Sequence, residues 1–181
     1  MNKGFTLIEL AIAIFILVVG IIGVYNSFST VVVLTAGSSS RFTAAYLAQE
    51  GIEIVRNMRD NNWIKWTQDQ STNWNYGLLG CENGCEADYK TGTPEDVRSG
   101  LTAFGGDGNN LKIGAGGFYS YDEIGGSSPT KFKRKITITS QIVNGVDVLK
   151  VSVLVTWKEK EQEGCDHGFC IDVEEYLYDW Y

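Results

Sequence analysis

The sequence predicts an α+β protein in which one long N-terminal helix packs on a C-terminal antiparallel β-meander. Three observations carry this prediction. An apolar run opens the chain at residues 5–24, a helical period follows at residues 42–60, and two alternating strands flank Asn144-Gly145. Helical and alternating periods of this kind indicate one apolar helix face and one apolar sheet face that cover each other. The expected domains after residue 4 are a helix at residues 5–60 and a globular head at residues 61–181.

The apolar run at residues 5–24 has the length and composition of a transmembrane helix. Fourteen of its 20 residues are Leu, Ile, Val or Phe, and Glu9 is its only charged residue. At about 1.5 Å per residue, such a helix spans the roughly 30 Å of a bilayer core. Each large apolar residue favours insertion by about 0.3–0.6 kcal/mol, and a central acid opposes it by about 3 kcal/mol. Insertion is therefore favoured in spite of Glu9.

A cleaved secretory signal and a plain membrane anchor are the two simpler interpretations of this run. The segment before it carries a single charged side chain, Lys3, and small residues of the kind found at a signal cleavage site come only at residues 35–37. Both features fit a secretory signal poorly. A plain anchor does not account for Glu9.

The residues around Glu9 supply a third interpretation. Lys3-Gly-Phe-Thr-Leu-Ile-Glu-Leu10 resembles the processing site of type IV prepilins and pseudopilins. The resemblance implies that a membrane peptidase cuts between Gly4 and Phe5 and methylates the new amine of Phe5. It also implies that Glu9 meets the N-terminal amine of a neighbouring subunit.

Elementary electrostatics gives Glu9 a meaning in that setting. A carboxylate one turn from a helix N-terminus complements the helix dipole. A charge pair between subunits stabilises one axial register of their helices, whereas helices with only apolar contacts can slide along one another. We therefore expect Glu9 to set the subunit register. The simpler alternative is a lone acid at headgroup level that water satisfies.

The amphipathic half of the helix is expected at residues 42–60. Its apolar face contains Ala44, Leu47, Ala48, Gly51, Ile52, Val55 and Met58, and its polar face contains Gln49, Glu50, Glu53, Arg56 and Asn57. Arg56 is spaced to pair with Glu53 and with Asp60. A kink or break is expected at residues 37–40, Gly-Ser-Ser-Ser. The stretch at residues 44–63 also looks like that of minor pilins and pseudopilins.

The head is expected to hold a loop-rich insert and a sheet. Residues 77–126 contain 13 of the 21 glycines and predict irregular structure with one short strand at residues 117–124. The sheet is expected at residues 132–180. Asn144-Gly145 predicts a two-residue type I′ hairpin that pairs Val143 with Val146. In that register Ile136 faces Val153, Thr137 faces Ser152, Ile138 faces Val151 and Thr139 faces Lys150, and residues 171–180 add a third strand.

Four cysteines form two close pairs, Cys81 with Cys85 and Cys165 with Cys170. Local disulfides suit a head exported to an oxidising compartment. Cross-pairing between the two loops is an alternative, as are free thiols. A zinc site from the four thiols, with His167 as a spare ligand, is a further alternative, although the spacings are wider than the usual Cys-x-x-Cys.

Other candidate sites are weaker. The loop at residues 106–110, Gly-Asp-Gly-Asn-Asn, offers oxygens to Ca²⁺ with help from Asp122 or Glu123, but it lacks an EF-hand pattern. Residues 131–135, Lys-Phe-Lys-Arg-Lys, are expected to be a solvated strand start, with DNA contact as the alternative. The net charge of −7 argues against nucleic acid as a general partner. His167 is expected in a surface loop.

No nucleophile motif, paired-carboxylate signature or phosphate loop is present in the sequence, so we expect no enzyme and no required cofactor. The expected function is that of a structural subunit, a minor pilin or pseudopilin of a type IV pilus or type II secretion-like filament. Its expected partners are other pilin subunits, the prepilin peptidase and the cytoplasmic membrane, with the head outside that membrane. The alternative is an uncleaved, membrane-anchored extracellular module that binds a ligand through its cysteine loops.

Overall fold

The computed structural model describes residues 4, 6–69, 72–93, 100–106, 109–122, 126–159 and 161–179. The chain divides into two compact units, residues 1–40 and residues 41–181. Helix α1, Leu7–Asp69, contributes to both units. Each unit is described by itself.

The first unit consists of the N-terminal part of α1. Residues Leu7–Phe28 form a 22-residue span with a mean hydropathy of 3.0, and none of it is buried within the protein. This span is long and apolar enough to cross a membrane, as predicted for residues 5–24. Phe5 lies outside the described residues.

The predicted break at residues 37–40 is wrong, because α1 is helical through this Gly-Ser-Ser-Ser segment. Glycine costs about 1 kcal/mol in a helix interior and serine less. Hydrogen-bonded helix on both sides outweighs so small a penalty.

The second unit contains the C-terminal part of α1, and the helix ends at Asp69 rather than at the predicted Asp60. Asn62 explains the extra turns. Its side chain is buried and donates from Nδ2 to the carbonyl oxygens of Trp74 (3.1 Å) and Tyr76 (2.7 Å). The returning chain therefore holds the last turns of α1 in helical form.

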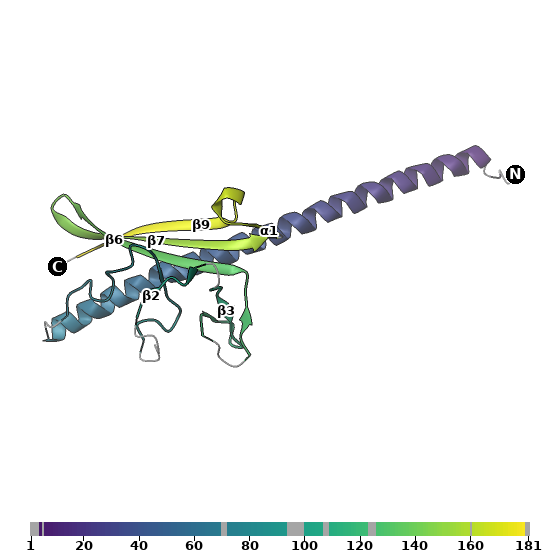
Figure 1. Ribbon diagram of the computed structural model, residues 1–181. Helices are drawn as coiled ribbons and strands as arrows, with labels where there is room; N and C mark the ends of the chain where they lie inside the picture. The colour runs from purple at the N-terminus through teal and green to yellow at the C-terminus, as the bar shows by residue number, and fades with distance from the viewer. Residues whose placement is uncertain are drawn as a thin grey trace. The chain divides into compact units, whose positions relative to one another are not determined.

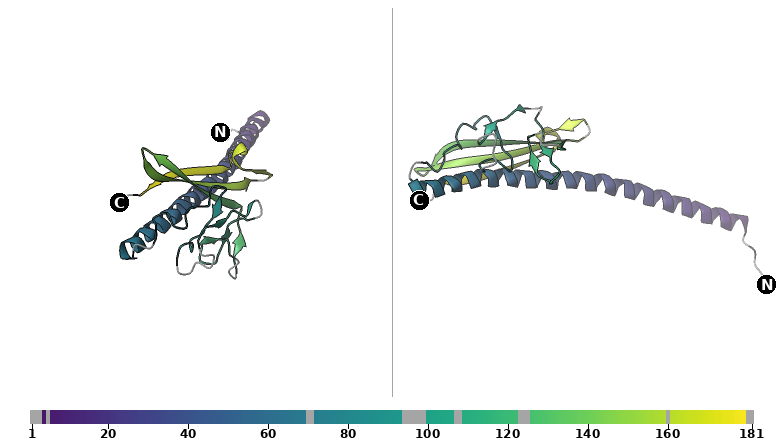
Figure 2. Two further views of the ribbon diagram at one scale, coloured as in Figure 1. Left: turned by 60° about the vertical axis from the view of Figure 1, so that its left-hand side comes forward. Right: turned by 90° about the horizontal axis from the view of Figure 1, so that it is seen from below.

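An antiparallel sheet lies along this part of α1 (Figures 1 and 2). Its long strands form a meander in which β7 is flanked by β6 and β9. The short strands β1 and β2 extend the sheet beyond β6, and β8 pairs with the end of β7. The bounds of the strands are β1 Cys85–Glu86, β2 Thr102–Ala103, β6 Phe132–Val143, β7 Val146–Glu159, β8 Gln162–Glu163 and β9 Cys170–Tyr178.

The structure confirms the predicted register of the hairpin. Val143 pairs with Val146, and every pairing predicted from Ile136 to Thr139 is present. Asn144 and Gly145 both have positive φ, 54° and 81°, as a type I′ turn requires. The third strand runs over Cys170–Tyr178, where residues 171–180 were predicted. Trp180, the last residue of the predicted strand, lies outside the described residues.

The glycine-rich insert contains more strands than predicted. Besides β1 and β2, it contributes to a separate three-stranded sheet of order β4-β3-β5. The strands are β3 Lys112–Ile113, β4 Tyr119–Ser120 and β5 Ser128–Pro129. Strand β4 replaces the longer strand predicted at residues 117–124. Two-residue strands bury too few side chains to produce a periodic pattern, so they could not be predicted from the sequence.

The core of the second unit forms where the apolar face of α1 meets the sheet. The predicted face is buried at Ala44, Leu47, Ala48, Gly51, Ile52 and Val55, with Met58 partly buried. At Gly51 the backbone of α1 lies close to a side chain of the sheet. A Cβ added there would lie 2.8 Å from Cγ1 of Val153 on β7, so only glycine fits without a shift of the sheet.

Candidate processing and assembly site

The N-terminus of α1 is closed by a reciprocal pair of hydrogen bonds. The Glu9 backbone amide donates to Oγ1 of Thr6 (3.4 Å), and the Thr6 amide donates to Oε2 of Glu9 (3.5 Å). This is a capping box, in which a Thr before the first turn and a Glu three residues later each satisfy a free backbone donor. The Thr-x-x-Glu spacing is a sequence signal for such a cap, and the sequence analysis above missed it.

The capping box places the acid near the candidate cleavage site. Thr6, whose amide Glu9 accepts, is separated from the Gly4–Phe5 peptide bond only by Phe5. Gly4 is exposed. The Glu9 carboxylate is therefore held at the end of α1 where a new amine at Phe5 would be created.

An apolar groove runs along the flank of the membrane-length span. It is lined by Leu17, Gly20, Ile21, Val24, Tyr25, Phe28 and Val32. Gly20 contributes no side chain, and a Cβ added there would meet nothing within 4 Å. Small residues of this kind let a second helix approach closely in a membrane. The surface is suited to packing against other apolar helices or lipid.

Two local disulfides join Cys81 to Cys85 and Cys165 to Cys170, with Cα–Cα distances of 5.3 and 4.9 Å. All four sulfur atoms are used in these two bonds, and no cysteine in the chain is free. The structure therefore contains neither cross-paired disulfides nor four thiolates for a zinc site. The first disulfide is buried in the core of the head, and the second lies at its surface.

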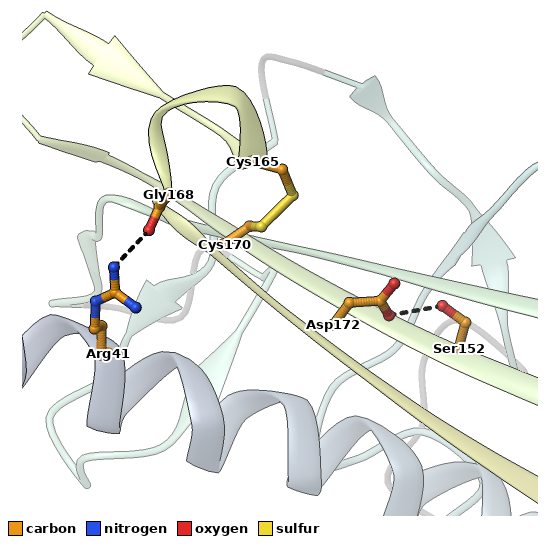
Figure 3. The surroundings of a disulfide bond; sticks show 6 residues. All are labelled: Arg41, Ser152, Cys165, Gly168, Cys170 and Asp172. Carbon is orange, nitrogen blue, oxygen red and sulfur yellow. Dashed lines mark hydrogen bonds between the residues drawn. A yellow bond between two sulfur atoms is a disulfide. The ribbon is translucent and has the colours of Figure 1, made fainter.

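The surface disulfide closes a loop that reaches back to α1 (Figure 3). Residues Cys165–His167 form a short 3-10 helix, η2, which Gly168 ends with a φ of 75°. The Gly168 carbonyl accepts a hydrogen bond from Nη2 of Arg41, at 3.0 Å. Arg41 is the first residue of the second unit. His167 is exposed in this loop, as predicted.

The basic stretch at residues 131–135 is not the solvated strand start that was expected. Lys131 pairs with Glu159 and Lys133 with Glu163, each at 2.6 Å. Arg134 is fully buried. Three of the four basic side chains are therefore paired or enclosed, because β6 lies between β1 and β7 in the sheet, with α1 on one face.

Arg134 is buried and bonds residues of other elements, which was not predicted from the sequence. Its guanidinium donates to the carbonyl oxygens of Leu47 (2.9 Å) and Ala87 (2.5 Å) and pairs with Glu50 at 3.2 Å. These partners belong to α1 and to the segment after β1. A buried charge with partners of this kind joins the helix, the sheet and the insert.

The candidate calcium loop is organised by a protein carboxylate. Glu86, which is buried, accepts from the Gly105 amide (2.7 Å) and from Nδ2 of Asn109 (2.5 Å). Asp122 lies 3.7 Å from Nζ of Lys90. Nδ2 of Asn110 donates to the Thr130 carbonyl at 2.8 Å. Three further residues considered for this site, Asp107, Gly108 and Glu123, lie outside the described residues. Among the described residues, no group of three or more His, Cys, Asp or Glu side chains is placed to hold a metal ion.

Ion pairs link β9 to α1 and to β7. Arg56 on α1 bonds Glu175 on β9 and Glu53 one turn away, and the hydrogen bond with Glu175 raises the pKa of Arg56. Glu174 likewise raises the pKa of Lys150 on β7 through a hydrogen bond. Asp60, the other predicted partner of Arg56, pairs with Arg59.

One comparison with known proteins gives a match, at the N-terminus. Residues 1–25 match the family described as the prokaryotic N-terminal methylation motif. No curated protein and no solved structure matches the chain. The matched residues contain the capping box, the candidate cleavage site and most of the membrane-length span. The chain therefore carries the signature of type IV prepilins and pseudopilins at its N-terminus, followed by an α+β head of pilin-like form.

Proposed function

We propose that this protein is a structural subunit, a minor pilin or pseudopilin, of a type IV pilus or type II secretion-like filament. The observation that carries the proposal is the match of residues 1–25 to the methylation motif, because this match includes most of the membrane-length apolar helix. The protein acts by assembly rather than by catalysis. Before assembly the helix holds it in the cytoplasmic membrane, with the head on the outer side.

The capping box and the apolar surface of the span support a route of processing and assembly. A prepilin peptidase removes residues 1–4 by cleaving after Gly4 and methylates the amine of Phe5. The exposed apolar surface of the span then packs against the helices of other subunits in the filament. Glu9 pairs with the Phe5 amine of a neighbouring subunit and sets the axial register, since an unpaired charge is costly in an apolar bundle.

The finer assignment to a minor subunit rests on the resemblance of residues 44–63. The two disulfides of the head suit an oxidising compartment, which supports a head that lies outside the cytoplasmic membrane. The head displays the insert, which is the part of the chain most free to serve a subunit-specific purpose.

The test is co-expression of the full chain with an active prepilin peptidase, followed by intact mass measurement and N-terminal sequencing under non-reducing conditions. We expect a mature chain that begins at N-methylated Phe5 and has lost the hydrogens of two disulfides. An inactive peptidase is the matched control and should leave residues 1–4 in place.

The alternative function is an uncleaved, anchored extracellular module. A chain that still begins at Met1 in the presence of active peptidase would support that alternative and contradict the filament proposal. A chain that begins near Ser38 would instead identify the apolar run as a secretory signal.

A further inference from the structure

Two aromatic side chains stack on the surface of the head, within the glycine-rich insert. The rings of Tyr89 and Phe118 have centroids 5.0 Å apart and an interplanar angle of 28°. Tyr89 is 38% exposed and Phe118 is 60% exposed. Single exposed apolar residues are ordinary. Stacking covers the facing sides of the two rings, but their remaining exposed parts form one apolar surface from two separate loops. We call this surface the aromatic platform.

The buried carboxylate of Asp88 holds both loops of the aromatic platform. It accepts hydrogen bonds from the Lys90 amide (3.1 Å), in the turn that carries Tyr89, and from the Tyr121 amide (3.4 Å), just after β4. Thr91 closes the turn by accepting the Asp88 amide at Oγ1 (2.9 Å). Asp88 is only 1% exposed. The rings are therefore presented by a fixed framework, so that little conformational entropy is lost on binding.

The loop between β3 and β4 leaves the Phe118 ring accessible. The Phe118 carbonyl accepts from the Gly114 amide at 3.0 Å, which closes the loop. A Cβ added at Gly116 would lie 3.3 Å from the Phe118 ring, and Gly117 has a φ of 81°. Glycines at these positions keep the loop tight and keep other side chains off the ring.

Polar groups of both kinds border the aromatic platform. Nζ of Lys90 lies 5.6 Å from the centroid of the Tyr89 ring. The same nitrogen lies 3.7 Å from Oδ2 of Asp122. A cation and a carboxylate that pair with each other thus lie beside the Tyr89 ring. Polar groups next to an apolar surface can fix the orientation of a small ligand that joins their hydrogen bonds.

We propose that the aromatic platform binds a neutral carbohydrate. The axial C–H bonds of a hexopyranose ring form a flat apolar face, which packs on the electron-rich face of the Phe118 ring. The hydroxyl groups at the edge of the sugar then bond Lys90 and Asp122. A nucleic acid would also stack on an aromatic ring, but Asp122 and the net charge of −7 repel phosphates. This activity goes beyond filament assembly and does not depend on it.

The experiment uses the full chain in a detergent that has no sugar headgroup. Cellohexaose, chitohexaose and maltohexaose are titrated separately, and binding is followed by calorimetry. We expect at least one of the three to bind with a Kd near 1 mM or tighter. Phe118→Ala should weaken that binding about tenfold, and Tyr89→Ala should weaken it by a smaller factor. Phe118→Trp should preserve or strengthen it.

Tyr76→Ala is the matched control, because Tyr76 is an aromatic residue on another loop of the head and is even more exposed than Phe118. It should change binding less than twofold, and circular dichroism should show all variants folded. Absence of binding to all three sugars overturns the proposal, as does an equal loss in Tyr76→Ala. Binding of an oligothymidylate but of no sugar would overturn it in favour of nucleic acid. Self-association that Phe118→Ala abolishes, without sugar binding, would overturn it in favour of a contact between copies of the chain.

Discussion

At the scale of single residues, Glu9 has two possible partners, and the structure describes one of them. Within its own chain the Glu9 carboxylate caps α1 by accepting the Thr6 amide. In the proposed filament it pairs with the amine of another subunit. Capping needs only a hydrogen-bond acceptor, and glutamine serves as well as glutamate in a capping box. Register pairing needs the negative charge. The two roles can therefore be separated by substitution.

Glu9→Gln should leave processing intact and abolish filament assembly, because it keeps the cap and removes the charge. Thr6→Ala should weaken the cap by about 1 kcal/mol and leave assembly largely intact. The measurement is the amount of sheared filament relative to processed subunit in the membrane. Normal assembly of Glu9→Gln would show that Glu9 acts only as a cap.

Lys150 provides a pH prediction at the same scale. Its hydrogen bond with Glu174 raises the pKa of Lys150 above the usual 10.5. A raised pKa in the folded state means that the ion pair contributes its full stability below pH 10.5 and loses it as the pH rises through the folded value. We expect the ¹³Cε titration of Lys150 to have a midpoint above 10.5. In Glu174→Gln, the matched control, the midpoint should fall back toward 10.5, and an unchanged midpoint would exclude Glu174 as the cause.

At the scale of elements, the contact between α1 and β7 depends on the absence of one side chain. Gly51 brings the helix against Val153 more closely than any other residue would allow. Glycine in a helix interior otherwise costs about 0.5–1 kcal/mol relative to alanine. The close approach of the sheet offsets that cost.

Gly51→Ala should destabilise the head by about 1–3 kcal/mol, since the new methyl group displaces Val153 or the helix. Gly37→Ala is the control. It lies in the same helix, but its added Cβ would meet nothing within 4 Å, so it should be neutral or slightly stabilising. Urea unfolding followed by tryptophan fluorescence measures both. Equal behaviour of the two variants would contradict the close packing at Gly51.

The two disulfides should differ in their response to a reductant. The Cys165–Cys170 bond is at the surface and the Cys81–Cys85 bond is in the core, so the first should be reduced sooner at low concentrations of dithiothreitol. Replacing Cys165 and Cys170 by serine should cost about 2 kcal/mol, the loop-closure entropy of so short a loop. It should also speed amide hydrogen exchange at residues 164–170, because the loop that bonds Arg41 loses its closure. Faster reduction of the core pair would contradict this order.

At the scale of the whole molecule, Arg134 joins three parts of the head that are far apart in the sequence. It bonds Leu47 on α1 and Ala87 after β1 while its own backbone lies in β6. Tyr121, in a later loop of the insert, adds a second contact with the insert by donating from its hydroxyl to the Arg134 carbonyl at 3.0 Å. The arrangement of helix, sheet and insert thus depends on one buried side chain.

Arg134→Met should destabilise the head by about 3 kcal/mol, because it leaves two carbonyl oxygens and Glu50 without their partner. Lys131→Met, which removes a partly exposed partner of Glu159, should cost less than about 1 kcal/mol. The shift in the urea midpoint of each variant checks the difference. Similar shifts in the two variants would mean that Arg134 contributes no more to the free energy of unfolding than a partly exposed lysine does.

The sequence by itself determined the parts of this protein whose signal is local. The membrane-length span follows from length and apolar content, the hairpin register from Asn144-Gly145 and alternation, and the buried face of α1 from its period. The candidate processing site follows from a short stretch that ends at Glu9. Each of these depends on neighbours along the chain, so periodicity and turn chemistry were sufficient.

Only the tertiary structure decided the rest. The end of α1 at Asp69 depends on Asn62 and a segment that returns to it, and the burial of Arg134 depends on the sheet and helix that enclose it. The aromatic platform requires Asp88 to join two loops. Such contacts link residues that are distant in the sequence, and their free energy depends on burial and geometry that no local pattern encodes. That is the physical reason why Arg134, in a basic stretch expected in solvent, is buried.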